Sequence, residues 1–597
     1  MKNKVIWLMF VVLVVFSLLL VSCGAKTTPT TTSTTTSVTS IKTTPVTTST
    51  TTTATAQTTK TGNWWDKLGA PKYGGTITFR TTNDIDSWDP YYINSGQSML
   101  NIFTDTLAGP AWKIDRDVWD FKINYVPLEY YSGRLAESWE VPDWSTYIFH
   151  IRKGIRWQDI PPVNGRELTA YDIEYVFHRE LGLGSGFTKA NPYVTAQELP
   201  IISVTATDKY TVVFKLNAPS VDVLDNLLQT NTRNHLVARE AIEKWGNVGD
   251  WKRAIGVGPF IVSDYVSGSS LTVVKNPNYY GYDERHPENR LPYADVLKVL
   301  IIPDDATSYA ALRTGKIDLI GSVRLQQAQS IARTNPELLQ VQIPSNGLSL
   351  DLRNDTSPFT DIRVKTALQM ALDLNTIAKT YYGGLVDGTP YCLAGSSLKG
   401  FYVPFNEWPK QVQYEYTYNP EGAKKLLADA GYPKGFKTNT AAATNQDLDL
   451  LQIIKAYLLD IGVDLEIKTM DPVSFSALKS AKKQDQMVVG ECALPWPPSR
   501  FLARGYSKNA TNWTFNNDPV YDKMYEKFMS SFDDTERKQL SREMDMYAVT
   551  KHWRIVFLPT VSTSFYQSWF KGYTGENQTP GMGGFGFTAA RVWIDRK

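Results

Sequence analysis

The chain has few of the side chains that enzymes and metalloproteins most often use for chemistry. Its 597 residues include three cysteines and five histidines, which excludes a disulfide framework and a cysteine zinc site. No two histidines have the spacing of an HExxH or HxH motif, and no Gly-x-Ser-x-Gly segment occurs. Gly315-Lys316 lacks the upstream glycine and the hydroxyl of a phosphate-binding loop. We therefore expect no metal, no cofactor and no enzymatic activity.

The chain also lacks an excess of charge of either sign. Lys and Arg number 62 and Asp and Glu number 60, which argues against nucleic acid as a partner. After Val21 no run is long and apolar enough to span a bilayer. Carboxylates are plentiful, so a glycosidase-like pair stays open. Cys392 and Cys492 can form one disulfide or remain two buried thiols.

The start of the chain carries the signals of export. Lys2 and Lys4 precede an apolar stretch from Val5 to Val21, and small residues follow. This order is typical of a secretory signal peptide. The ending Leu20-Val21-Ser22-Cys23 resembles a bacterial lipobox, which implies that residues 1–23 are a lipoprotein signal and that Cys23 is acylated. A plain signal peptide and a transmembrane anchor are the alternatives, although 17 residues is at the bottom of the spanning range.

Residues 24–63 predict a disordered tether. Thr fills 20 of the 34 positions from 27 to 60, and no acidic or aromatic residue occurs among them. Such a segment buries too little apolar area to offset the entropy of ordering. With an acylated Cys23, it predicts an extracytoplasmic protein that is lipid-anchored to the cell membrane.

The body of the chain alternates helices and strands as α/β proteins do. Thr169 to Asp172 resembles a capping box at the start of a helix. Asn419-Pro420 and Gly431 mark the two ends of another helix. A helix at 447–461 leads directly into an alternating strand at 463–468, which is the return half of a wound α/β unit.

Other elements follow from apolar spacing. One continuous helix is expected from Asp361 to Gly383-Gly384, with an apolar face made by Val364, Leu368, Ala371, Leu374 and Ile377. Shorter strands are expected at Thr76–Arg80, Ser270–Lys275 and Val296–Ile302.

Sequence blocks over residues 73–597 occur in a characteristic order. The blocks are Tyr73-Gly74-Gly75-Thr76-Ile77, Ser87-Trp88-Asp89-Pro90, Leu135-Ala136-Glu137-Ser138-Trp139-Glu140, Tyr147 to Trp157, Leu168 to Ile173, Gly256-Val257-Gly258-Pro259-Phe260, Lys275 to Tyr280, Leu312 to Asp318, Pro358 to Leu368 and Ala423 to Gly431. Together and in this order, they resemble the large extracytoplasmic solute-binding proteins of ABC importers in the oligopeptide, dipeptide and nickel class, family 5.

The resemblance implies an α/β fold with two lobes. It is a periplasmic-binding-protein-like (type II) clamp that closes around a ligand by a hinge motion, with an inserted β-rich subdomain. We expect the first lobe at 64–343, with the inserted subdomain at about 95–205. The second α/β lobe is expected at 344–559, and 560–597 returns to the first lobe.

The resemblance also implies where the ligand binds. In peptide-binding members the segment after the Asp-Pro motif lies along the ligand, and here it contains Asn94, Ser95 and Gly96. A second family pattern, Trp-x-Ala-Asp, supplies an aspartate that holds the peptide's α-ammonium. The matching residues here are Glu491, Cys492, Ala493 and Leu494, with Trp496 close behind.

The second segment departs from the family pattern at its key residue. Leu494 stands in place of the aspartate and cannot pair with an ammonium, whose burial without a partner is costly. Either Glu491 supplies the charge, the alignment shifts by a few residues, or the ligand has no free amine. Family members that bind oligosaccharides use aromatic platforms, for which Trp496, Trp513 and Trp88 are candidates, with a place in the lobe core or at the cleft rim as the alternative. No His or Met cluster suits nickel.

The expected function is therefore capture of an oligomeric solute and delivery to the permease subunits of an ABC importer. The family favours an oligopeptide, and an oligosaccharide is the other candidate ligand. A receptor that presents its ligand to a membrane sensor, and a secreted glycan-processing enzyme, are the alternatives. We expect a monomer whose contact with the membrane is the lipid anchor.

Overall fold

The computed structural model describes residues 62–92, 97–123, 125–191, 199–228, 235–396, 398–492, 497–576 and 585–596. Gly62–Lys597 is one compact unit. Several residues singled out above lie outside the described residues: Cys23 and the Thr-rich segment, Asn94, Ser95, Gly96, Ala493, Leu494 and Trp496.

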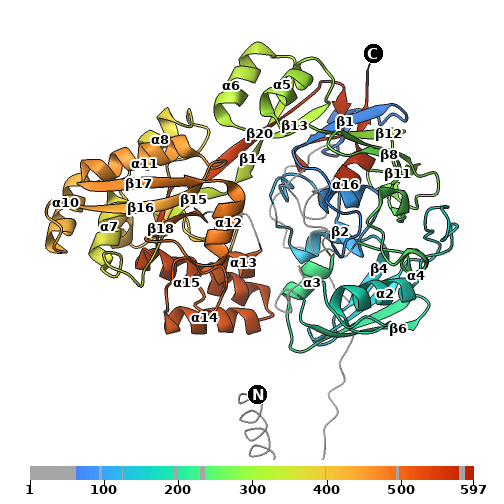
Figure 1. The fold of residues 1–597 in the computed structure, drawn as a ribbon, viewed down its shortest axis with the longest axis horizontal. Coiled ribbons are helices and arrows are strands. Elements are labelled where there is room, and N and C mark those ends of the chain that lie inside the picture. Colours follow the sequence, from blue (N-terminus) through green and yellow to red (C-terminus); the bar gives the residue numbers. More distant parts are fainter. Residues whose placement is uncertain are drawn as a thin grey trace, which may run out of the picture. The chain divides into compact units, whose positions relative to one another are not determined.

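A seven-stranded mixed sheet forms the centre of the first lobe (Figure 1). Its strands, in spatial order, are β14 (Leu339–Ser345), β20 (Thr560–Tyr566), β13 (Leu319–Val323), β1 (Thr76–Thr81), β12 (Val296–Ile301), β9 (Ser270–Lys275) and β8 (Phe260–Val266). Alternate residues such as Ile77 and Phe79 are buried in its core, as a half-buried strand requires. Helices α5 (Asp305–Arg313), α6 (Leu325–Thr334) and α16 (Phe585–Arg591) belong to this lobe.

A second, antiparallel sheet forms a subdomain inserted into the first lobe. Its order is β4 (Ala136–Glu140), β5 (Thr146–Ile151), β7 (Thr211–Leu216) and β6 (Ile201–Asp208). Helix α2 (Ala170–Leu181) packs on it, and α3 (Asp222–Leu228) and α4 (Arg239–Trp245) follow. Its hydrophobic cluster draws on residues from Leu107 to Val257, so we propose 107–257 as the extent of the subdomain rather than about 95–205.

Three short pairs of strands complete the sheets of the first lobe. They are β2 (Ala108–Pro110) with β3 (Tyr131–Gly133), β10 (Tyr282–Asp283) with β11 (His286–Arg290), and β21 (Phe570–Lys571) with β22 (Trp593–Ile594).

A five-stranded sheet forms the centre of the second lobe (Figure 1). Its order is β17 (Val463–Met470), β16 (Phe436–Ala443), β18 (Met487–Cys492), β15 (Gly347–Leu352) and β19 (Arg554–Val556). The helices of this lobe are α7 (Ile362–Met370), α8 (Leu374–Thr380), α9 (Lys410–Glu415), α10 (Pro420–Asp429), α11 (Leu448–Asp460), α12 (Pro472–Ser480), α13 (Pro498–Leu502), α14 (Pro519–Ser530) and α15 (Asp534–Lys551).

In the described residues the chain crosses between the two large sheets twice, and these crossings form the hinge. Strand β14 passes through Asn346 into β15, and β19 passes through Phe557–Pro559 into β20. Strands β14 and β20 pair in antiparallel register from Leu339 with Tyr566 to Ser345 with Thr560. The Thr560 hydroxyl donates to the Asn346 carbonyl at 2.7 Å, which ties the two crossings together.

Most of the predicted elements are confirmed. Thr169 and Asp172 form the capping box of α2, and the Asn419 side chain accepts the Gly422 N–H at the start of α10. Strand β17 follows α11 as expected. The single helix predicted from Asp361 to Gly383 is wrong, because it is two helices, α7 and α8. Asp373 caps α8 by accepting the Thr376 N–H, which starts a new helix there.

None of the helices among the described residues combines the length and the apolar character needed to cross a bilayer.

Candidate functional site

Two cavities are lined by residues of both lobes, and they meet at the hinge. The cleft cavity has a volume of about 430 Å³ and the hinge cavity about 700 Å³. Their walls share Pro344, Ser345, Thr560 and Val561 of the two hinge crossings. Both volumes lie in the range of small-molecule sites, roughly 300–1,000 Å³.

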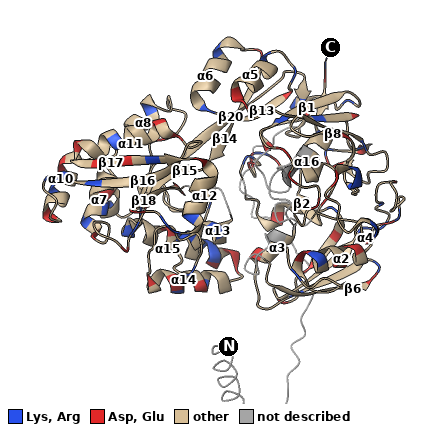
Figure 2. Ribbon diagram, in the orientation of Figure 1, with Lys and Arg blue, Asp and Glu red and all other residues tan. Residues whose placement is uncertain are grey.

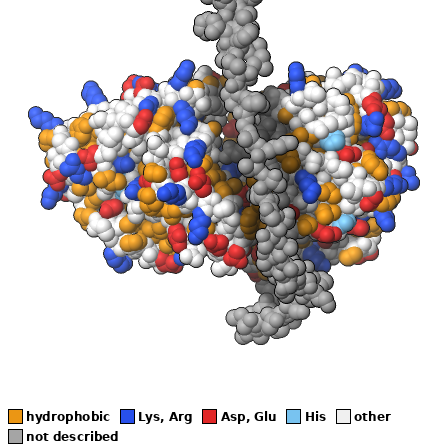
Figure 3. All heavy atoms as spheres, turned by 90° about the horizontal axis from the view of Figure 1, so that it is seen from below, with side chains coloured by type: hydrophobic (Ala, Val, Ile, Leu, Met, Phe, Trp, Pro, Cys, Tyr) orange, Lys and Arg blue, Asp and Glu red, His pale blue; other side chains and the backbone are white. Residues whose placement is uncertain are grey.

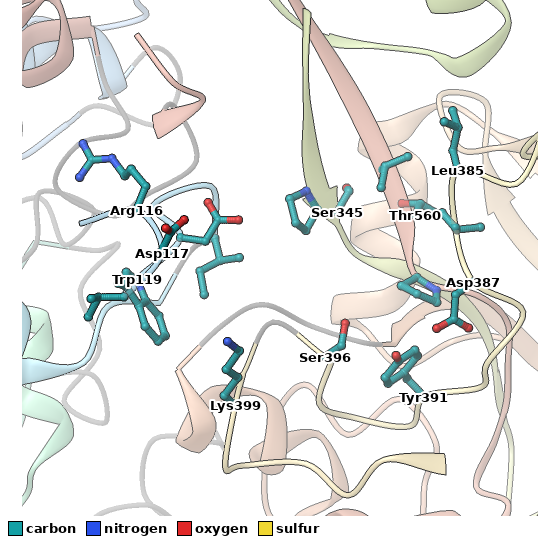
Figure 4. A pocket seen from close by; sticks show the side chains of 18 residues that line it. Arg116, Asp117, Trp119, Ser345, Leu385, Asp387, Tyr391, Ser396, Lys399 and Thr560 are labelled. Atoms are coloured by element: carbon teal, nitrogen blue, oxygen red, sulfur yellow. The ribbon is translucent and has the colours of Figure 1, made fainter. Parts of the chain in front are cut away.

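The cleft cavity lies between a first-lobe loop and a second-lobe loop (Figure 4). Arg116, Asp117 and Trp119 stand on one side, and Asp387 and Tyr391 on the other. Asp387 is exposed and accepts the Thr389 N–H at 2.5 Å. The cavity therefore offers one aromatic ring and one or more carboxylates from each lobe.

Arg116 is used within the first lobe rather than for a ligand. Its guanidinium pairs with buried Glu576 at 3.0 Å and donates to the carbonyls of Trp112 and Ile114, each at 2.9 Å. It also lies 3.9 Å from the centre of the Trp64 ring. Burial lowers its pKa, with Glu576 opposing the shift. With these contacts made, Arg116 acts as a structural cation.

The hinge cavity lies at the carboxyl ends of β16 and β18, where ligands bind in many open α/β sheets. The second lobe contributes Tyr381, Tyr382, the segment from Thr444 to Asp449, and Glu491. The first lobe contributes the segment from Ser322 to Gln326, at the start of α6. This cavity therefore joins the first turn of a first-lobe helix to the strand ends of the second lobe.

Glu491 reaches the hinge cavity, but its charge is already paired. Arg504 donates to its carboxylate at 2.6 Å, and Asn346 donates at 3.3 Å. Burial would raise the pKa of Glu491, yet the attraction of Arg504 and of Lys479 holds it below its ordinary value. Because it carries a charge that Arg504 balances, Glu491 is a poor single anchor for an ammonium group.

The other described candidates lie in different settings. Trp513 is half-buried beside Arg504, and the Lys479 ammonium lies 3.6 Å from the centre of its ring. Trp88 is 4% exposed and packs in the first-lobe core against Phe103 and Tyr265, the lobe-core alternative given above.

Both described cysteines are buried and free, so they form no disulfide. The Cys492 thiol donates to the Leu348 carbonyl at 3.1 Å and borders neither cavity. Burial raises the pKa of this thiol to about 12. The structure thus joins Glu491 and Trp513 through Arg504, whereas Trp88 and Cys492 do not line either cavity.

Sequence reasoning missed the residues that line the cavities from outside the two family segments. Trp119 and Tyr391 belong to loops and gave no periodic signal. Asp447 and Asp449 begin a helix directly after a strand, and that strand–loop–helix order could have identified them.

The lobes also touch away from the hinge, at contacts we call the interlobe latch. Arg537 of α15 pairs with Asp222 of α3 at 3.1 Å, and it donates to the carbonyls of Phe528 and Ser531. Beside them, the rings of Trp144 and Phe532 stack with centroids 5.8 Å apart and planes 12° apart. Bridges of this kind can form only while the two lobes are together.

Charge is mixed over the described surface. Basic and acidic residues are intermixed along both lobes (Figure 2). On the face seen from below, they lie among scattered hydrophobic side chains (Figure 3). Within the described ranges no three His, Cys, Asp or Glu side chains gather in a group that could hold a metal ion.

Residues 131–513 match the family described as bacterial extracellular solute-binding proteins, family 5 Middle. The heme-binding protein A of Haemophilus influenzae is 30% identical over 321 residues, which cover 51% of this chain and 54% of that protein. The chain thus spans about half the length of that relative. The periplasmic oligopeptide-binding protein OppA of Salmonella typhimurium is 23% identical over 507 residues, or 81% of this chain and 89% of that protein.

A solved structure shows the same fold. The periplasmic binding protein DppA from Helicobacter pylori, in complex with the peptide STSA, superimposes with a TM-score of 0.67 at 23% identity. The likeness covers 88% of this chain and 99% of that one.

Proposed function

The chain belongs to family 5 of the bacterial extracellular solute-binding proteins, and we propose that it captures a short peptide between its lobes and delivers it to an ABC importer. The observation that carries the proposal is a pair of cavities lined by both lobes at a two-strand hinge. A ligand held there touches both lobes, so its binding favours the closed arrangement.

A peptide is favoured over an oligosaccharide by the walls of these cavities. The hinge cavity contains carboxylates on one side and Arg324 on the other, which suits a ligand with charged ends. Trp88 is a core residue, and Lys479 covers one face of Trp513, which leaves at most one face of that ring for a sugar to stack on. The relatives named for oligopeptides and for the peptide STSA support the same choice.

Calorimetry of the mature protein against a peptide panel and an oligosaccharide panel tests this function. We expect one peptide per protein molecule and no chemical change in the bound peptide. Cleavage of a peptide or glycan by the purified protein would instead place it among enzymes. If an oligosaccharide binds, Trp496→Ala should weaken its binding about tenfold, since a stacked ring contributes roughly 1–3 kcal/mol.

We also propose that Cys23 carries a lipid and that the Thr-rich segment is a tether. Fully extended, the 34 residues from 27 to 60 would reach on the order of 100 Å, so the body could range above the membrane. Cys23→Ala should leave the signal uncut or release the protein from membranes, whereas Cys392→Ala should not. Mature, membrane-bound Cys23→Ala protein would contradict the lipid anchor.

A further inference from the structure

The two walls of the hinge cavity carry opposite charge. Arg324 and the start of α6 face it from the first lobe, and Asp447, Asp449 and Glu491 face it from the second. Arg324 is exposed and pairs with no acidic group in the described part of the chain. It is the N-cap residue of α6, and an arginine side chain has no acceptor with which to cap the helix. The first N–H groups of this ten-residue helix therefore add to the positive wall.

On the negative wall, Asp447 is held in place by the second lobe. Its Oδ1 accepts the Leu450 N–H at 3.1 Å and the Tyr381 hydroxyl at 2.7 Å. Asp447 and its neighbour Asp449 form no ion pair with any described residue, in contrast to Glu491, which Arg504 balances. The uncompensated negative charge of the cavity thus lies at the start of α11.

One uncharged polar residue of the cavity wall, Tyr382, also lacks a hydrogen-bond partner for its side chain among the described residues. Tyr382 is 4% exposed, and its hydroxyl has no hydrogen-bond partner within the described ranges. A buried hydroxyl without a partner is costly, so such groups are nearly always satisfied by protein, water or ligand. Because this oxygen is itself buried, a ligand in the cavity reaches it only if the Tyr382 side chain turns toward the cavity.

We propose that the hinge cavity binds the two charged ends of a zwitterionic short peptide. The peptide ammonium pairs with Asp447 and Asp449, and its carboxylate binds Arg324 and the N-terminus of α6. This inference rests on the proposed function and supplies the ammonium site that Leu494 does not. A peptide of two or three residues is about 7–10 Å long and suits a volume of about 700 Å³.

The arrangement also explains selection between ligands. Walls of opposite sign belong to different lobes, so they attract each other across the empty cavity. A neutral ligand would displace water from both charged walls without giving either one a charged partner. A zwitterion gives each wall a new partner of the right sign, so it binds without that loss.

Peptides with blocked ends, combined with charge-removing variants, test this site. The probes are trialanine, N-acetyl-trialanine and trialanine amide, titrated calorimetrically into the full-length mature protein. Each block should weaken binding to the natural protein about tenfold or more. In the double variant Asp447→Asn/Asp449→Asn, acetylation should change the affinity by no more than about twofold, because asparagine keeps the helix cap but not the charge. Arg324→Gln should do the same for amidation.

Matched controls lie at the far ends of the same helices. Asp460→Asn on α11 and Arg333→Gln on α6 remove an exposed charge outside the cavity, and both should keep the natural discrimination. Free and blocked trialanine bound equally by the natural protein would overturn the dipolar site while leaving peptide capture in place. A double variant that still discriminates against acetylation would also overturn it. If no di- to tetrapeptide binds, the proposed function fails together with this site.

Discussion

Removing the charge of Asp222 should weaken ligand binding without unfolding either lobe. In the interlobe latch, the Arg537 side chain is 9% exposed and the Asp222 side chain 23% exposed, and they lie 3.1 Å apart. Pairs on an open surface contribute about 0–1 kcal/mol, and breaking a fully buried pair costs about 3–5 kcal/mol. The latch lies between these limits, so Asp222→Asn should cost about 2 kcal/mol.

That loss should act on the balance between open and closed lobes. Because the pair joins α3 of the first lobe to α15 of the second, it exists only when the lobes are together. If the closed form is the minor one without ligand, 2 kcal/mol raises the apparent Kd by about 30-fold. The denaturation midpoint of the lobes should change little, because Asn and Asp have similar helix propensities and the lost interaction of the charge with the start of α3 is worth less than about 1 kcal/mol.

Titration calorimetry at low and high ionic strength measures the effect. Salt screens the pair, so the natural protein should approach the affinity of Asp222→Asn as the ionic strength rises. Asp264→Asn, which removes an exposed first-lobe charge outside the latch, is the control and should bind as the natural protein does. Equal affinities for Asp222→Asn and the natural protein at low salt would refute the latch.

Three further predictions concern stability. Burial raises the pKa of Asp545 to about 6, so the folded protein binds a proton at this carboxyl group more tightly than the unfolded chain does. The stability that this proton contributes is present below about pH 4 and is lost as the pH rises through 6. Asp545→Asn should therefore gain up to about 3 kcal/mol relative to the natural protein between pH 4 and 7, measured by denaturant unfolding; a constant difference would contradict the assignment. Asp373→Ala removes the cap of α8 and should cost about 1 kcal/mol in the same assay, whereas an unchanged midpoint would count against the cap. Gly347→Ala would place a Cβ 2.5 Å from the Leu558 carbonyl oxygen and 2.8 Å from Cys492 Sγ. The crowding should lower the free energy of unfolding by about 1–3 kcal/mol. A free energy of unfolding equal to that of the natural protein would contradict this prediction.

Local signals predicted the elements that begin and end with clear caps. Asn419 before Pro420, and Thr169 before Asp172, fix helix starts through hydrogen bonds within a few residues, so the sequence alone shows them. The break between α7 and α8 was missed because the apolar residues Val364, Leu368, Ala371 and Leu374 continue across it at intervals of three or four residues. Asp373, the cap that marks the break, looks like any other polar residue of an exposed face.

The site was harder to predict because its partners are distant in sequence. Arg324 and Asp447 come from different lobes and meet only where the fold brings β13 and β16 to one cavity. The pairing of Glu491 with Arg504 likewise depends on how α13 packs beside β18. Family resemblance pointed to the second segment, whose Glu491 lines this cavity, but it could not show which carboxylates lie there without a paired cation.

Small-angle X-ray scattering of the mature protein, with and without a saturating zwitterionic peptide, tests the central claim most directly. If the lobes close on a solute held at the hinge, the peptide-bound protein should have a smaller radius of gyration than the free protein. An unchanged radius of gyration, at a peptide concentration that calorimetry shows to be saturating, would contradict capture by closure between the lobes.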